Sequence, residues 1–167
     1  MSLFLPYSIF IFCFLDKTTL GNFTLNSIIN LKTSLIAPCG MNCGLCLGYH
    51  RTKNKCTGCN STGSNKPNHC INCLIKLCDS LQANHSRFCF NCKKYPCTRI
   101  KNLDKRYKVK YGMSMIENLN TIKEIGIRKF VQREKERWTC PKCGNMICVH
   151  RDSCLICGTK RIIKSYK

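Results

Sequence analysis

Cysteines are the residues whose number and spacing most clearly point to a chemical role, and they make up 17 of the 167 residues. Twelve of them form pairs separated by two residues. On a tight turn, two thiolates at this spacing can bind one metal ion, and two such pairs complete a tetrahedral site. Secreted disulfide-rich domains usually have an even cysteine count without this spacing. The pattern therefore predicts metal ligands and, because free thiolates need reducing conditions, a cytoplasmic protein. The pairs are Cys43/Cys46, Cys56/Cys59, Cys70/Cys73, Cys89/Cys92, Cys140/Cys143 and Cys154/Cys157.

The last two pairs are separated by ten residues, and a glycine follows each pair. Ten residues leave room for a short hairpin, and glycine lets the backbone turn toward the sulfur atoms. We expect residues 138–160 to form a zinc ribbon that is structural, because four protein ligands leave no open position. Between the pairs, Cys148 and His150 are alternative ligands, but we favour a buried thiol for Cys148 and a surface histidine for His150. The predicted zinc ligands are Cys140, Cys143, Cys154 and Cys157.

A second set of eleven cysteines lies between residues 39 and 97. Two four-cysteine sites would use eight of these cysteines and leave three. A third metal site would therefore need a histidine, an outside ligand or a shared thiolate as its fourth ligand. His50, His69 and His85 are available, although an isolated histidine is more often a surface residue. The spacing leaves open which cysteines share an ion. The candidate ligands are Cys39, Cys43, Cys46, Cys56, Cys59, Cys70, Cys73, Cys78, Cys89, Cys92 and Cys97.

The first three cysteines of this set, Cys39, Cys43 and Cys46, have the spacing of the loop that holds a four-iron cluster in radical S-adenosylmethionine enzymes. Those enzymes need a large βα barrel after the loop, and only 121 residues follow Cys46. An iron–sulfur cluster without that chemistry is the stronger alternative to zinc. We therefore keep a [4Fe–4S] cluster at part of Cys39–Cys97 as the alternative cofactor.

Other catalytic patterns are missing from the sequence. It has eight Asp and Glu residues, no phosphate-binding glycine loop and no Gly-x-Ser-x-Gly motif. We therefore assign no enzymatic activity and identify no small-molecule substrate. The predicted function is a zinc-stabilised binding or adaptor module, and the alternative is an iron–sulfur protein with a redox or enzymatic role.

The charge is strongly basic, with 28 Lys and Arg against 8 Asp and Glu, or +20 formally. A basic surface favours a polyanionic partner, either nucleic acid or an acidic protein, although a merely solvated surface has the same composition. Cations neutralise phosphates while aromatic rings stack on unpaired bases. The candidate nucleic-acid contacts are Lys101, Lys105, Arg106, Tyr107, Lys108, Lys110 and Tyr111.

Helical signals are concentrated between residues 112 and 137. Ser114 and Glu117 form a capping box, apolar residues recur at helical spacing, and Gly126 is a plausible stop. The pattern predicts one broken helix or two short ones. Residues 35–100 contain mainly turn signals, with one helical turn expected after Cys73. We therefore predict a small, metal-stabilised α+β fold with a loop-rich cysteine domain and a carboxy-terminal zinc ribbon.

The amino-terminal residues 1–34 differ from the rest. Leu3 to Leu15 contains 11 apolar residues in 13, with no Lys or Arg before Lys17. This run is too short to span a bilayer, and no clear membrane span is expected. It is a weak targeting segment, a buried element or, as we favour, an extension from an upstream start codon. Cys13 is given no ligand role. The expected regions are 1–34, 35–100 (metal-binding), 101–137 (basic linker and helices), 138–160 (ribbon) and 161–167 (basic tail).

The run Ala37-Pro38-Cys39-Gly40-Met41-Asn42-Cys43-Gly44-Leu45-Cys46 resembles the opening of a family labelled domain of unknown function 3795. The later cysteine groups, up to Phe88-Cys89-Phe90-Asn91-Cys92-Lys93-Lys94-Tyr95-Pro96-Cys97, resemble it in order and spacing, over about residues 35–100. The stretch Asp104 to Tyr107 and the Trp138-x-Cys140-Pro141-x-Cys143 ribbon are similar to those of longer members. The resemblance implies a prokaryotic, cysteine-rich, metal-binding protein and supplies no activity.

Overall fold

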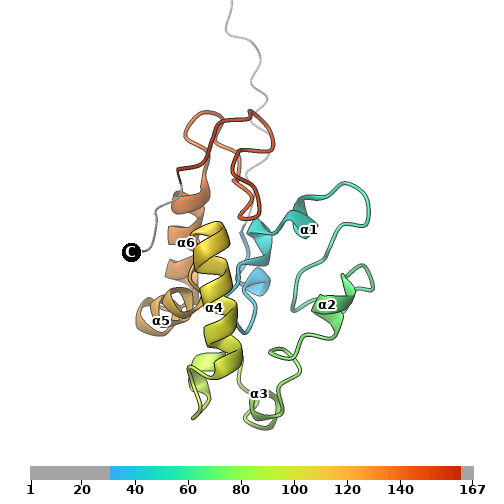
Figure 1. Ribbon diagram of the computed structural model, residues 1–167, viewed down its shortest axis with the longest axis vertical. Coiled ribbons are helices and arrows are strands. Elements are labelled where there is room, and N and C mark those ends of the chain that lie inside the picture. Colours follow the sequence, from blue (N-terminus) through green and yellow to red (C-terminus); the bar gives the residue numbers. More distant parts are fainter. Residues whose placement is uncertain (1–30, 163–167) are drawn as a thin grey trace, which may run out of the picture.

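The computed structural model describes residues 31–162, whose regular secondary structure is mostly helical (Figure 1). Strand pairing within these residues is limited to isolated bridges, at Ile36–Asn42, Thr139–Met146 and Ser153–Lys160. The helical part of the predicted α+β fold is therefore present, and the predicted hairpin is reduced to bridges. The predictions for Leu3–Leu15 and Cys13 lie outside the described residues. The α-helices are α1 (Leu47–His50), α2 (Asn68–Ile71), α3 (Asp79–Ala83), α4 (Thr98–Tyr111), α5 (Met115–Ile125) and α6 (Ile127–Trp138), and the 3-10 turns are η1 (Thr33–Leu35), η2 (Cys43–Leu45) and η3 (Cys89–Asn91).

Helices α5 and α6 occupy the region where helical signals are concentrated. The Ser114 hydroxyl accepts a hydrogen bond from the Glu117 N–H at 3.0 Å, which caps α5 as predicted. Gly126 ends α5 with a φ of +81°, a conformation that costs glycine little, and α6 starts at the next residue. The prediction left one broken helix or two short ones open, and the chain forms two.

Helix α4 occupies the stretch that we expected to begin a basic linker. Lys and Arg have good helix propensity, and the helix ends at Gly112, which has a φ of +60°. Ile100 is fully buried, while Leu103 and Tyr107 pack against the core. A narrow apolar stripe among many cations is therefore sufficient to anchor this helix.

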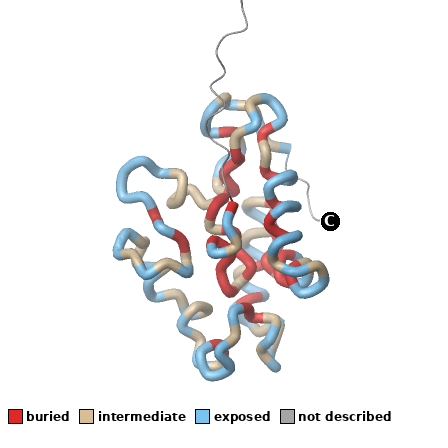
Figure 2. The backbone as a smooth tube through the Cα atoms, turned by 180° about the vertical axis from the view of Figure 1, so that it is seen from behind, coloured by how far each residue is buried: buried red, intermediate tan, exposed pale blue. Residues whose placement is uncertain are grey.

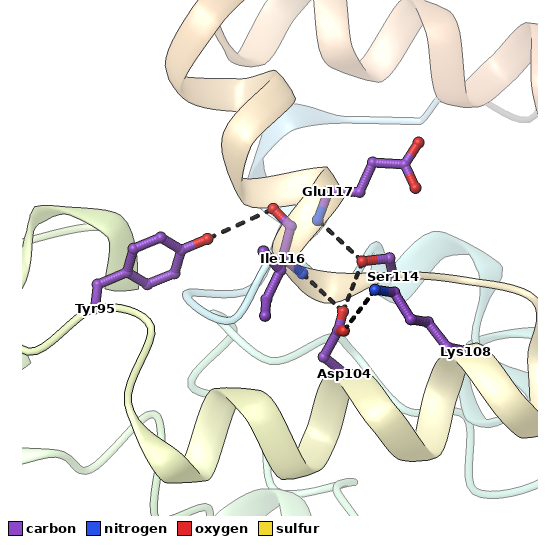
Figure 3. A network of polar contacts seen from close by, with 6 residues as sticks. All are labelled: Tyr95, Asp104, Lys108, Ser114, Ile116 and Glu117. Carbon is purple, nitrogen blue, oxygen red and sulfur yellow. Dashed lines mark hydrogen bonds and ion pairs between the residues drawn. The ribbon is translucent and has the colours of Figure 1, made fainter. Parts of the chain in front are cut away.

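A buried carboxylate joins α4 to α5 (Figure 3). Asp104 accepts hydrogen bonds from the Ser114 hydroxyl at 2.6 Å and the Ile116 N–H at 3.0 Å, and its second oxygen lies 3.1 Å from Lys108 Nζ. Burial alone would raise the pKa of Asp104, but these three donors outweigh it and hold the pKa below its usual value. The network fixes the angle between two helices whose connection is only three residues long.

The segment between Cys39 and Cys43 packs on α5. Asn118 donates its side-chain N–H to the Gly40 carbonyl at 3.0 Å. Gly40 has a φ of +84°, and a Cβ at this position would lie 2.9 Å from both Leu119 Cγ and the Met115 carbonyl oxygen. Only glycine fits this approach, and the contact places Cys39 at the edge of the core.

The segment that contains α1, α2 and α3 is mostly loop. It follows the side of the molecule opposite α5 and α6, and its surface is largely exposed (Figures 1 and 2). Between residues 47 and 87 the buried residues are Cys56, Gly58 and Leu81. The predicted helical turn after Cys73 is present, because Leu77 N–H donates to the Cys73 carbonyl at 2.9 Å.

Within residues 31–162, no helix is both long enough and apolar enough to cross a membrane.

Candidate metal centre

Four cysteine sulfur atoms meet near the carboxyl end of the described chain. All four ligand atoms lie within 4.8 Å of one another, and the group could hold a metal ion. Two of the sulfur–sulfur distances, Cys140–Cys157 and Cys143–Cys154, are both 3.6 Å. Cys140 and Cys154 are buried, whereas Cys143 and Cys157 are half-buried. The structure therefore brings together the four residues that the spacing predicted.

Two similar turns present these cysteines. Gly144 N–H donates to the Cys140 carbonyl at 2.9 Å, and Gly158 N–H donates to the Cys154 carbonyl at 3.0 Å. Both glycines have a φ of +70°, which other residues rarely adopt. An isolated bridge then closes each turn, from Thr139 to Met146 and from Ser153 to Lys160. The two turns have the same local geometry and face each other across the sulfur atoms.

The thiols of this group differ in acidity. Hydrogen bonds from the Thr159 side chain and backbone lower the pKa of Cys157 to about 6. Burial and the neighbouring Cys143 and Cys157 thiols raise the pKa of Cys154 to about 11. Four thiolates this close repel one another, so all four ionise together only when a cation lies between them.

The four-cysteine turns are joined to the helices through Trp138, the single tryptophan of the chain. Its indole N–H donates to Glu134 Oε1 at 3.3 Å, and the guanidinium of Arg161 lies 4.8 Å from its ring centre. Its carbonyl accepts the Ile147 N–H at 2.7 Å. The side chain is 3% exposed, so any loosening of these turns changes its surroundings.

A second connection runs through His150. Its Nδ1 accepts the Leu47 N–H at 3.2 Å, and its Nε2 lies 3.1 Å from the Tyr107 hydroxyl. Nearby, the Val149 N–H donates to the Leu45 carbonyl at 2.8 Å. His150 is therefore half-buried with both ring nitrogens engaged, rather than the surface histidine that we expected. The spacing gave no signal for this role, because both partners are distant in sequence.

Cys148 is fully buried, as predicted, and its sulfur is not part of the four-cysteine group.

The eleven other candidate cysteines are arranged differently. Within residues 31–162, no other set of three His, Cys, Asp or Glu residues places its ligand atoms within 4.8 Å of one another. The Cys59 N–H donates to Cys43 Sγ at 3.3 Å, which links the first two groups. Burial is the main cause that raises the pKa of Cys43 and of Cys89 to about 12 and that of Cys70 to about 11. The other cysteines of this set are Cys39, Cys46, Cys56, Cys73, Cys78, Cys92 and Cys97, all of them free thiols.

The three histidines available to these cysteines join no compact ligand group. His69 and His85 are exposed. His50 is half-buried, and burial lowers its pKa.

The candidate nucleic-acid residues divide into two groups on α4. The rings of Tyr107 and Tyr111 pack edge-on against His150, with centroid distances of 5.8 and 4.8 Å. Lys108 pairs with Asp104. The remaining side chains are exposed, namely Lys101, Lys105, Arg106 and Lys110.

Comparison with known proteins gives one match. A family model described as "Protein of unknown function (DUF3795)" matches residues 35–102. No curated protein and no solved structure matches the chain. The four-cysteine group at 140–157 lies outside the matched segment. The cysteine-rich segment at residues 35–102 therefore carries the DUF3795 pattern, as its resemblance indicated.

Proposed function

We propose that the chain is a multi-metal protein in which Cys140, Cys143, Cys154 and Cys157 bind one structural Zn²⁺. The sulfur–sulfur distances of 3.6 Å support this most directly. Zinc binds thiolates at about 2.3 Å, and the edge of a tetrahedron with that radius is about 3.8 Å. Two of the six sulfur–sulfur distances are thus close to the spacing that one tetrahedral ion requires, and all six are within 4.8 Å.

A structural rather than catalytic role follows from the ligand set. Four protein thiolates fill a tetrahedral zinc ion and leave no position for water or substrate. The segment between the two turns carries Val149 and His150, which contact Leu45, Leu47 and Tyr107. Zinc would hold this segment against the helices. The folded chain would then act as a module that binds a partner or connects partners as an adaptor.

Metal analysis of single-cysteine variants tests the proposal. We expect Cys143→Ser to contain one zinc ion fewer per chain than the parent protein, as measured by native mass spectrometry. Cys148→Ser is the matched control, because it removes a buried thiol from the same segment and should keep the zinc. Equal zinc content in the parent protein and Cys143→Ser would rule out the assignment.

Binding of a polyanion such as nucleic acid is a second candidate function. The observation that favours it is the exposure of Lys101, Lys105, Arg106 and Lys110 along one helix. Such contacts would bind phosphates without base specificity, because the two tyrosines of α4 face His150.

Salt-dependent titration with single-stranded RNA tests this second function. We expect the double variant Lys101→Ala/Lys105→Ala to reduce the slope of log K against log[salt] by about 1.4, or 0.7 per lost contact. Lys123→Ala/Lys129→Ala is the charge-matched control, because it removes two exposed lysines from α5 and α6. An equal effect of both variants, or no binding at low salt, would exclude α4 as the site.

A further inference from the structure

One partly open cavity is lined by four cysteines that lie outside the proposed zinc site. Its volume is about 30 Å³, and Cys78, Cys89, Cys92 and Cys97 all line it. The other lining residues are mostly apolar, namely Ile75, Leu81, Tyr95, Arg99 and Ile100. The spacing of the sequence did not group these four, because Cys78 belongs to no Cys-x-x-Cys pair.

Each of these cysteines lies at the end of a short element. Cys78 precedes α3, Cys89 and Cys92 bound η3, and Cys97 is the N-cap residue of α4. Leu81 from α3 and Ile100 from α4 are 6% and 0% exposed, so each of the two helices contributes a buried side chain to the lining. Four cysteines from three elements therefore line one mostly apolar cavity.

The sulfur atoms of this cavity are too widely spaced for one ion. No three of them lie within 4.8 Å of one another, whereas the carboxy-terminal group has distances of 3.6 Å. A tetrahedral zinc ion would need all six distances near 3.8 Å. In a four-iron cluster each thiolate binds a different iron, so the cluster itself keeps the sulfur atoms apart.

The charge around the cavity suits a cluster with four thiolates. Such a cluster is an anion when its core is doubly positive. The 14-residue helix α4 begins at this cavity, where its dipole has its positive end, and the Cys97 side chain forms no capping hydrogen bond that would occupy it. Arg99, which also lines the cavity, adds a positive charge.

We propose that Cys78, Cys89, Cys92 and Cys97 bind a [4Fe–4S] cluster in this cavity. The inference does not depend on zinc at Cys140–Cys157, since the two sites share no ligand. It assigns four of the eleven cysteines to one centre and leaves seven for other ligand sets.

The test uses the full chain, purified without oxygen and reconstituted with ferrous iron and sulfide. We expect about four iron and four sulfide per chain and a broad visible absorption band. Cys92→Ser and Cys97→Ser should each lose most of the iron and the band. Cys70→Ser is the matched control, because it removes a half-buried thiol of the same segment from outside the cavity. Iron lost equally in Cys70→Ser, or zinc without iron in the reconstituted parent protein, would overturn the proposal.

Alkylation of the unmodified sequence covers the case in which the variants misfold. In the reconstituted protein, Cys78, Cys89, Cys92 and Cys97 should resist iodoacetamide, and they should react after an iron chelator removes the cluster. Peptide mass spectrometry measures each cysteine separately. If chelation exposes a different set of four, the cluster lies elsewhere and the assignment is wrong.

Discussion

Two segments of equal length show how differently parts of this chain are held together. Residues 47–87 and 98–138 each contain 41 residues, yet the first buries three of them and the second thirteen. The second segment forms α4, α5 and α6 around Ile100, Met115 and Leu119. The first has five cysteines and only short helical turns.

With metal bound as proposed, this contrast predicts where folding would depend on it. A segment that buries so little apolar surface does not offset the conformational entropy of ordering its backbone. The helices contribute a large share of the buried core, which they share with residues such as Leu45 and Val149 from the neighbouring segments. We therefore regard α4–α6 as the support on which the cysteine-bearing segments are assembled when metal binds.

Removal of metal should have the largest effect. Strong chelation should abolish amide-exchange protection in residues 47–97 and 139–160 and leave protection in α4–α6, because the proposed metal ligands lie in the cysteine segments and none lies within the three helices. Binding of structural zinc is worth about 10–16 kcal/mol in small zinc domains. Hydrogen exchange with mass spectrometry measures each segment, and Trp138 fluorescence reports on the carboxy-terminal turns. Equal loss of protection throughout would contradict the contrast.

Truncation of the core should affect the helices directly. Leu119→Ala should reduce the free energy of unfolding by about 2–5 kcal/mol, because Leu119 is fully buried against Gly40. Urea unfolding followed by circular dichroism measures the change. Val109→Ala, on an exposed position of α4, should change it by about 0.5 kcal/mol or less. Loss of bound metal before the helices unfold would show that the core also supports the cysteine segments.

Glu134 provides a pH-dependent test of the junction between the helices and the carboxy-terminal turns. Burial raises its pKa to about 7, although Arg137 and Trp138 oppose the shift. Between about pH 4.3 and 7, the folded state therefore binds more protons than the unfolded state, and the free energy of unfolding falls as pH rises.

Glu134→Gln should remove this fall. At about pH 8 the variant should be more stable than the parent protein by up to about 3 kcal/mol, since glutamine stays neutral and still accepts from Trp138. Urea unfolding at about pH 5 and pH 8 measures the difference. The exposed Glu136→Gln on the same helix is the control and should retain the pH dependence of the parent. An unchanged pH dependence in Glu134→Gln would mean that this carboxyl titrates normally.

The smallest expected effect concerns the polar network between α4 and α5. Ser114→Ala should reduce the free energy of unfolding by about 1 kcal/mol, because it removes the α5 cap and one donor to Asp104. Thermal unfolding measures this change, with the exposed Ser64→Ala as control. If Ser114→Ala lost bound metal while its free energy of unfolding stayed unchanged, the network would support the cysteine segments rather than the helices.

Local signals in the sequence predicted local structure well. Ser114 and Gly126 mark the ends of α5 because capping and positive φ depend on neighbouring residues alone. The close approach of Cys140, Cys143, Cys154 and Cys157 followed from two short turns, each of which fixes its own pair.

Contacts between distant residues were not predictable in the same way. Cys78 lines one cavity with Cys89, Cys92 and Cys97 only because α3 and α4 meet there, and spacing does not encode that meeting. Helix α4 was expected to be linker because its apolar stripe is narrow and cations dominate its composition. His150 contacts Leu47 and Tyr107, which are 103 and 43 residues away.

The position of His150 limits whether the carboxy-terminal turns could be exchanged for those of another protein. A zinc ribbon transplanted from another protein would reproduce the four thiolates but not an imidazole that contacts Leu47 and Tyr107 simultaneously. Burial and the charges of Arg151 and Arg161 lower the pKa of His150, which keeps the ring neutral and able to accept the Leu47 N–H. In a chimera, this one side chain would have to be carried over together with the cysteines for the graft to dock.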